Sequence, residues 1–347
     1  MHYRPLGQTG MHVSTLGLGT MMFGAVGNSD AADCARILHA ALDAGINLVD
    51  TADMYSDGEA ETIVGEALKA RRGEVILATK GHFPVATEDR NRQGNSRRHL
   101  TAAVEDSLRR LQTDWIDLYQ VHRPDPHTAI DETLATLDDL RAAGKIRAYG
   151  CSTFPADQIV DAWHTAQALG VTPFRTEQPS YSLLQRQIER AELSVCERYR
   201  MGVIVWSPLA AGWLSGRIRR DAPIAQTQHR PSIQANVFDT EREEHQRKLD
   251  AVEQLTQLAA TTDCTLPQLA IAFTLSHPAV TAAVLGPRTI DQLTSLLDSS
   301  ELVLDDAVLD RIDAITPPGT GQFPEWTWQP PGIADPALRR RPKRHNQ

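Results

Sequence analysis

The chain has 347 residues, of which 41% are hydrophobic and 23% are charged, so it holds enough apolar material to bury a sizeable core. This length fits either two domains or one α/β barrel, and it excludes a small peptide-like scaffold. The net charge of -9 argues against a broad nucleic-acid-binding surface.

Short apolar runs alternate with longer amphipathic stretches along most of the chain. The short runs predict strands at Ser14–Gly17, Ile46–Asp50, Val75–Lys80, Trp115–His122, Ile146–Cys151, Phe174–Gln178, Val203–Ser207 and Val280–Leu285. The amphipathic stretches predict helices at Asp30–Ala44, Gly58–Ala70, Ser96–Leu111, Asp131–Ala143, Pro155–Leu169, Gln187–Arg200, Glu244–Thr261 and Thr289–Leu297. This alternation predicts an α/β fold, a single (β/α)8 TIM barrel over residues 1–316. A doubly wound sheet is the alternative, but Met22 stands where a GxGxxG motif needs its third glycine.

Two regions depart from the alternation, and both fall late in the chain. Leu209–Val237 is a long loop after the seventh strand, and Pro317–Gln347 is a Pro-rich tail that ends in a basic cluster. Loops of this length in compact domains are often functional, so the tail either lines a substrate pocket or covers it. The basic cluster fits a solvated terminus better than a nucleic-acid contact.

The remaining composition bears on location and on metals. An uncharged run at Cys264–Pro287 is interrupted by proline and polar residues, which disfavours a membrane-spanning helix. The four cysteines lack CxxC spacing, and this argues against a disulfide framework and fits a cytoplasmic protein. The histidines show no ligand-like spacing, so we expect no metal site.

Polar residues close nearly every predicted strand, and in a barrel such residues meet at one mouth. Asp50 and Lys80 close adjacent strands and are expected to pair, which keeps the lysine charged. Tyr55 follows in the next loop, where an adjacent ammonium is expected to lower its pKa and make it a proton donor. His122 closes the fourth strand and is expected to orient a substrate oxygen.

Three segments together resemble the aldo-keto reductase family, including its potassium-channel β-subunit branch. Gly45–Tyr55 resembles the Asp/Tyr signature, Leu77–Lys80 the lysine motif and Asp117–Asp125 the histidine motif. The resemblance covers roughly Tyr3 to Asp313 and implies a barrel with an N-terminal hairpin. It also implies that NADPH reduces an aldehyde or ketone, with the catalytic roles assigned to Asp50, Tyr55, Lys80 and His122.

The same resemblance implies a cofactor extended across the mouth without a Rossmann domain. It assigns cofactor contacts to Thr20, Asp50, Ser152, Gln178, Trp206, Ser207, Leu209, Gly212, Gly286, Arg288 and Gln292. Arg288 at a helix N-terminus suits a 2′-phosphate, which favours NADPH (NADP+) over NADH. Family members often carry Asn at the positions of Thr153 and Leu296.

Other interpretations remain open. A regulatory module that binds cofactor with negligible turnover is the main alternative to the reductase. An aldolase using Lys80 as a Schiff base is disfavoured, because Asp50 would keep that amine charged. Arg123 and Asp125 are either loop salt-bridge residues or substrate contacts. The aromatic candidates for the substrate pocket are Trp213, Phe238, Trp326 and Trp328, whereas no pattern indicates the individual carbonyl substrate or the oligomeric state.

Overall fold

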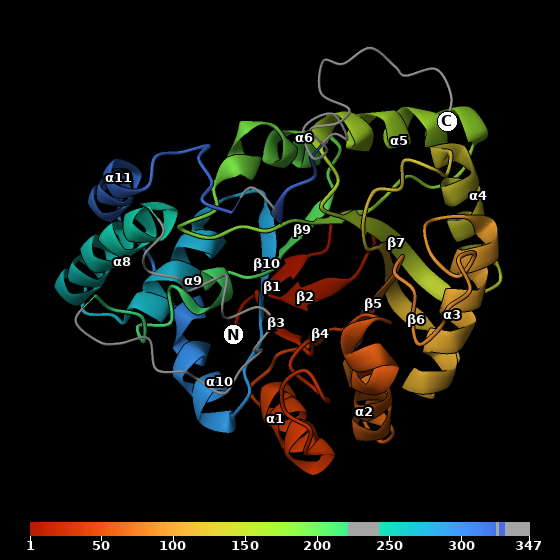
Figure 1. Ribbon diagram of the computed structural model, residues 1–347, viewed down its shortest axis with the longest axis horizontal. Helices are drawn as coiled ribbons and strands as arrows, with labels where there is room; N and C mark the ends of the chain where they lie inside the picture. Colours follow the sequence, from red (N-terminus) through yellow and green to blue (C-terminus); the bar gives the residue numbers. More distant parts are fainter. Residues whose placement is uncertain (221–242, 324–325, 330–347) are drawn as a thin grey trace.

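The computed structural model describes residues 1–220, 243–323 and 326–329 and has parallel strands at its centre with helices around them (Figure 1). The strands are β1 (Tyr3–Pro5), β2 (His12–Ser14), β3 (Leu16–Gly19), β4 (Leu48–Asp50), β5 (Ile76–Gly81), β6 (Ile116–Val121), β7 (Ile146–Ser152), β8 (Thr176–Gln178), β9 (Gly202–Val205) and β10 (Val280–Leu285). The helices are α1 (Ala31–Asp43), α2 (Glu59–Leu68), α3 (Arg97–Leu111), α4 (Ile130–Ala142), α5 (Ala156–Leu169), α6 (Glu192–Arg198), α8 (Glu243–Thr261), α9 (Leu266–Ser276), α10 (Ile290–Leu297) and α11 (Asp306–Ile315). Phe238, the end of the tail with its basic cluster, and most of the long loop lie outside the described residues.

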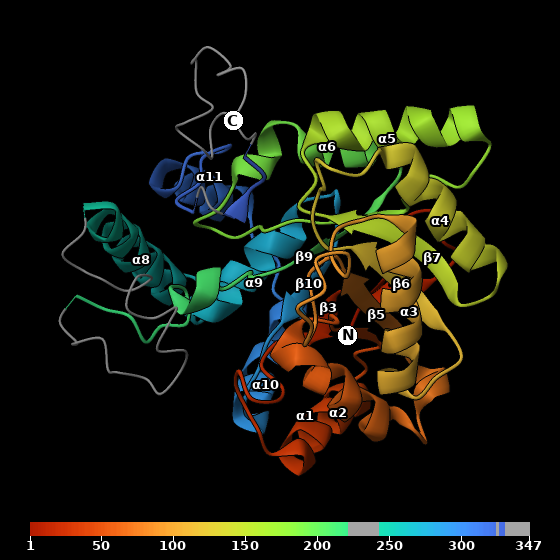
Figure 2. The same ribbon diagram turned by 45° about the vertical axis from the view of Figure 1, so that its right-hand side comes forward.

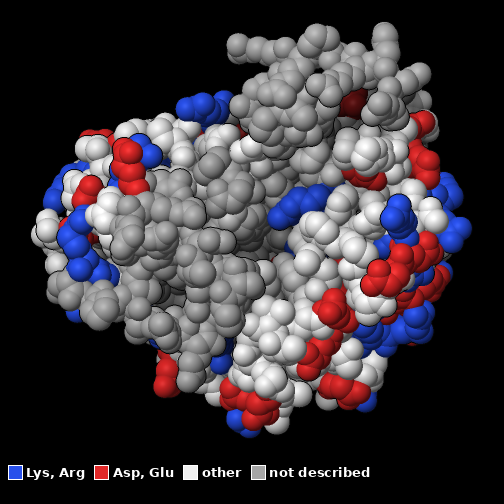
Figure 3. Space-filling view, in the orientation of Figure 1, with Lys and Arg blue, Asp and Glu red and all other residues white. Residues whose placement is uncertain are grey.

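The barrel closes in the order β10-β3-β4-β5-β6-β7-β8-β9, and every neighbouring pair is parallel. This confirms the predicted (β/α)8 architecture. In both ribbon views α8 and α11 lie side by side on the flank away from α3 and α4 (Figures 1 and 2). On the flank that carries α3 and α4, acidic and basic side chains are interspersed (Figure 3). We find no described helix with both the length and the apolar composition needed to cross a bilayer.

The apolar core has two parts, one inside the barrel and one between the strands and the helices. Leu48, Leu118 and Ile204 belong to the inner part, together with Leu6 and Val13 from the N-terminal hairpin. The hairpin pairs β1 with β2, and its Leu6 and Val13 pack against the inner core. The position of the hairpin is fixed by elements near the other end of the sequence. Arg4 donates to the carbonyl oxygens of Val280 (2.6 Å) and Leu275 (3.1 Å).

The largest errors in the strand predictions concern the first strand. Ser14 belongs to the hairpin, whereas the barrel strand is β3 at Leu16–Gly19. Glycine has a low intrinsic strand preference, so the Gly17 and Gly19 backbone forms a strand through tertiary pairing and not through local propensity. The predicted helix at Gln187–Arg200 is also divided, since Ala191 (φ -150°, ψ -47°) leaves helical geometry before α6.

Two late features were not predicted. The helix α11 packs against α8, and residues 317–323 then contact residues 184–186 in the loop after β8. Phe323 is only 1% exposed, and the Arg186 amide donates to the Thr320 carbonyl oxygen at 2.7 Å. The first part of the predicted tail therefore packs as part of the barrel domain.

Candidate active site

The barrel brings the predicted strand-end residues to one mouth because parallel strands all end there. Asp50 ends β4 and Lys80 lies near the end of the adjacent β5, while Ser152 pairs in register with Gln178 across β7 and β8. His122 follows β6 directly. Five of the predicted site residues thus come from consecutive strands of the same ring.

Asp50 and Lys80 form a buried ion pair at this mouth. The Lys80 Nζ atom donates to Asp50 Oδ2 at 2.7 Å and to the Thr51 carbonyl oxygen at 2.7 Å, and Lys80 is 1% exposed. Burial lowers the pKa of Lys80, but Asp50 and Tyr55 raise it more, so the net change is upward. The second Asp50 oxygen accepts from Gln178 Nε2 at 2.7 Å. The lysine therefore stays charged, as the sequence predicts.

Tyr55 starts the single-turn helix Tyr55–Gly58, which is bent by the left-handed backbone of Ser56 (φ 49°) and Asp57 (φ 52°). The centroid of the Tyr55 ring lies 5.3 Å from Lys80 Nζ. Burial raises the pKa of Tyr55, and the opposing effect of Lys80 is smaller. The expectation of a lowered pKa is therefore wrong for this state of the protein, because desolvation outweighs the ammonium. The phenol is protonated at neutral pH, as a proton donor must be before it acts.

His122 lies beside Tyr55 and is 6% exposed. Its ring centroid is 6.0 Å from that of Tyr55 and 5.2 Å from that of Phe83, both in edge-on geometry. Burial, followed by the charges of Lys80 and Arg123, holds the pKa of His122 well below its ordinary range. Its Nδ1 has no hydrogen-bond partner among the described residues. A neutral imidazole here can donate one hydrogen bond to a substrate oxygen.

The residues assigned to the nicotinamide lie around this cluster. Ser152 Oγ donates to the Gln178 carbonyl oxygen at 2.8 Å, which leaves its lone pairs for an amide N–H of a ligand. Thr20 is buried and its hydroxyl donates to the Asp50 carbonyl oxygen at 3.2 Å. Trp206 lies just after β9, 5.3 Å from the Trp326 ring. These contacts with other protein groups fix the orientation of Ser152, Thr20 and Trp206.

The residues assigned to phosphates form two adjacent turns. Ser207 Oγ accepts from the Ala211 amide at 3.0 Å, and the Gly212 amide donates to the Leu209 carbonyl oxygen at 2.9 Å. After β10, Gly286 leads to Arg288, whose amide donates to Gln292 Oε1 at 2.9 Å.

Arg288 has the features of an anion-binding residue. Its Nη1 is buried without a hydrogen-bond partner among the described residues. Burial, followed by the charge of Arg217, lowers its pKa. Two cations near each other, one of them just before α10, favour a bound phosphate. Sequence reasoning missed Arg217, which lies close to Arg288 only in three dimensions.

The aromatic residues predicted to line the substrate pocket differ in their exposure to solvent. Trp213 is fully buried and packs against His245, with ring centroids 5.4 Å apart, so it does not line an open pocket. Trp326 stacks on Phe323, with ring centroids 4.0 Å apart, and also lies against Trp206. Both Trp326 and Trp328 are partly exposed. No group of three or more potential metal ligands occurs within the described ranges.

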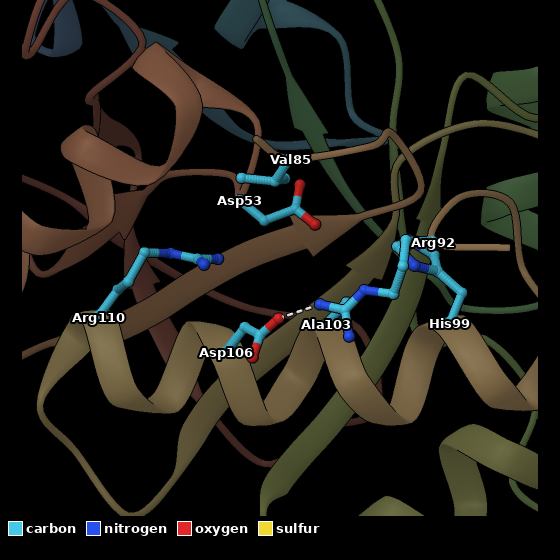
Figure 4. Close-up of a pocket in the computed structure, with 7 residues that line it drawn as sticks. All are labelled: Asp53, Val85, Arg92, His99, Ala103, Asp106 and Arg110. Carbon is cyan, nitrogen blue, oxygen red and sulfur yellow. Dashed lines mark hydrogen bonds and ion pairs between the residues drawn. The ribbon is translucent and has the colours of Figure 1, made fainter. Parts of the chain in front are cut away.

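A small polar cavity lies between Asp53 and α3 (Figure 4). Its lining includes Asp53, His99 and the ion pair between Arg92 and Asp106. Burial, followed by the charge of nearby Glu61, raises the pKa of Asp53 well above its ordinary range. None of the residues that line this cavity belongs to the cluster of Asp50, Tyr55, Lys80 and His122.

Glu177 is a buried carboxyl beneath the mouth, and burial raises its pKa to about 8. One oxygen accepts from the Phe154 amide at 3.1 Å, while Oε2 has no partner among the described residues. The folded protein keeps a proton that the unfolded chain releases above pH 4.5. The free energy of unfolding should therefore fall by about 1.4 kcal/mol for each pH unit between these two pKa values.

We expect Glu177→Gln to remove this pH dependence, because glutamine resembles the protonated carboxyl. Urea unfolding at pH 6 and pH 8.5 should show that the variant gains stability relative to wild type at the higher pH. The exposed Glu197→Gln is the control. Parallel pH profiles for wild type and Glu177→Gln would refute the raised pKa.

The chain is similar to known proteins over most of its length. The model of the aldo/keto reductase family matches residues 15–317. The chain is 34% identical to the uncharacterized oxidoreductase YrpG of Bacillus subtilis, over 94% of this chain and 100% of that protein. It is 36% identical to the aldo-keto reductase YhdN of the same organism, over 85% and 88%. It is also 31% identical to a probable voltage-gated potassium channel subunit beta of rice, Oryza sativa subsp. japonica, over 91% and 96%. The chain therefore belongs to the aldo/keto reductase family.

Proposed function

We propose that this protein uses NADPH to reduce an aldehyde or ketone to an alcohol. Family membership supports an oxidoreductase that acts on carbonyl groups. The observation that carries the proposal is the cluster of a buried Asp50–Lys80 pair, a protonated Tyr55 and a neutral His122 at one mouth. We further propose a cytoplasmic location, since all four cysteines are free.

The described residues fit a reduced nicotinamide dinucleotide. Ser152 and Gln178 offer hydrogen-bonding groups for a carboxamide, and Trp206 offers a ring surface. At the other side of the mouth, Arg288 and the start of α10 offer an anion site. When bound, NADPH supplies the hydride that the carbonyl carbon accepts.

The chain's own residues would handle the proton and the orientation of the substrate. Tyr55 gives its phenolic proton to the carbonyl oxygen as negative charge develops there. The ammonium of Lys80 stabilises the resulting phenolate, and Asp50 keeps that ammonium charged. His122 donates a hydrogen bond that holds the same oxygen in place.

The experiment is an absorbance assay of NADPH and NADH oxidation with 4-nitrobenzaldehyde, comparing wild type with Arg288→Gln. We expect wild type to turn over and to prefer NADPH. The variant should bind NADPH about 10- to 100-fold more weakly, the range for charge-assisted hydrogen bonds, with NADH affinity nearly unchanged. The exposed Arg98→Gln on α3 is the matched control.

Two results would contradict the proposal. Equal losses of NADPH and NADH affinity would remove the 2′-phosphate role of Arg288. If wild type binds NADPH but reduces no member of an aldehyde, ketone and quinone panel, the regulatory-module alternative takes precedence. That alternative is favoured by the similarity to the probable channel subunit.

A further inference from the structure

Arg123 is a cation at the catalytic mouth that the proposed mechanism does not use. It follows His122 directly after β6 and is partly buried. Its Nη1 donates to the His122 carbonyl oxygen at 2.7 Å and to Thr153 Oγ1 at 3.1 Å. Both acceptors are neutral, so these bonds hold the guanidinium in place without balancing its charge.

No carboxylate oxygen of the described residues lies within ion-pair distance of Arg123. Asp125, the other half of the expected loop salt bridge, instead accepts from the Asn95 and His127 amides at 2.8 and 2.9 Å. The loop salt-bridge interpretation of Arg123 therefore fails for the described chain. Asp125 caps its own turn.

The surrounding titratable groups supply no compensating negative charge at neutral pH. Burial lowers the pKa of Arg123, and only Tyr55 and Glu177 oppose this effect. Both are protonated near pH 7, because burial raises the pKa of Tyr55 and brings that of Glu177 to about 8. His82 is also nearby, and burial lowers its pKa. A partly desolvated guanidinium in neutral surroundings is stabilised by an anionic ligand.

The backbone that holds this guanidinium is itself unusual. Thr153 has φ 60°, in the left-handed region that β-branched residues rarely adopt. Its amide donates to the Gln178 carbonyl oxygen at 3.2 Å, and its hydroxyl faces Arg123. Thr153 therefore fixes one edge of the guanidinium through Nη1, while Nε and Nη2 make no hydrogen bonds to described residues.

The position of Arg123 in the ring separates it from the proposed phosphate site. Arg288 follows β10, and β6 is the strand four places away in the closed ring of eight. The two cations therefore lie on opposite sides of the barrel mouth. An anion at Arg123 lies beside Tyr55 and His122, where the carbonyl substrate must be, and across the mouth from the cofactor phosphates.

We propose that Arg123 determines substrate specificity by binding a carboxylate on the carbonyl substrate, so that the preferred substrates are oxo acids or aldehydes bearing a carboxylate. This inference rests on the proposed reductase function. The planar edge formed by Nε and Nη2 matches the two oxygens of a carboxylate in a bidentate pair. The carbonyl then lies toward Tyr55 and His122, and the carboxylate lies toward Arg123.

The test compares 4-carboxybenzaldehyde with its neutral methyl ester, methyl 4-formylbenzoate, at saturating NADPH. Wild type should have at least a tenfold higher kcat/KM for the carboxylate. Arg123→Gln keeps a side-chain amide that can donate to Thr153, and it should raise KM for the carboxylate about 10- to 100-fold. Its KM for the ester should change less than about threefold, and Arg97→Gln, at an exposed ion pair on α3, should change neither.

A wild-type preference for the ester, or an equal loss on both substrates, would overturn the proposal. A third substrate, 4-formylphenyl phosphate, tests the anion: a stronger preference for it would also refute the carboxylate assignment. Calorimetric titration of the NADPH-bound protein with 4-carboxybenzoate separates this inference from the proposed function. If no aldehyde is reduced, the reductase proposal fails, but weaker binding of 4-carboxybenzoate by Arg123→Gln would still support the anion site. Unchanged binding would refute it.

Discussion

Tyr55→Phe should lower kcat for carbonyl reduction by about 10²- to 10⁴-fold, the usual contribution of general acid catalysis. The variant removes only the hydroxyl, so the ring beside Lys80 and His122 is retained. Affinity for NADPH should change little, because the phenol is assigned to the substrate oxygen. Stopped-flow absorbance gives the rate, and NADPH fluorescence gives the affinity.

The control is Tyr199→Phe, a tyrosine at the end of α6 that stacks on Trp163. It should retain wild-type kcat. If Tyr55→Phe keeps more than about a tenth of the wild-type rate, another group donates the proton. If it loses NADPH affinity in parallel with rate, Tyr55 has a structural role at the mouth.

Lys80→Met should reduce the free energy of unfolding by about 3 to 5 kcal/mol, the usual cost of removing one partner of a buried ion pair. Asp50 would keep only its bond to Gln178 and would remain a buried carboxyl without a counter-charge. Asp50→Asn should cost a similar amount, since it leaves the ammonium unpaired. Urea unfolding at pH 7 measures both variants.

The double variant Asp50→Asn with Lys80→Met decides the origin of the loss. It should be more stable than the sum of the single losses predicts, because neither charge is left alone. Lys69→Met is the matched control, since its pair with Glu66 is exposed and should contribute less than about 1 kcal/mol. Additive losses, or single losses no larger than that of Lys69→Met, would contradict the ion-pair explanation.

Strand order and the convergence of Asp50, Lys80 and His122 could be predicted because they follow from local pattern and barrel geometry. β10 is found where its apolar run predicts it, at Val280–Leu285. β3 is displaced because Gly17 and Gly19 carry no local strand signal, and their pairing depends on tertiary neighbours.

The charges and pKa values at the site were less predictable than the identity of the residues that form it. The pKa direction of Tyr55 depends on how much water the fold removes, which no residue spacing reveals. Arg123 has no carboxylate partner because Asp125 accepts hydrogen bonds from its own loop. The position of residues 317–323 depends on contacts with Gln185 and Arg186, which are far away in sequence. These properties arise only from the assembled chain.

The N-terminal hairpin also has a consequence for the order of folding. Arg4 is bound by Val280, 276 positions later, and β3 completes the ring only beside β10. During synthesis β3 therefore has no partner on one side until β10, more than 260 positions later, has left the ribosome. Closing so long a loop is entropically costly, so ring closure should be a late step in folding. Until then, the edge of β3 and the apolar side chains of Leu6 and Val13 are exposed and need protection from aggregation.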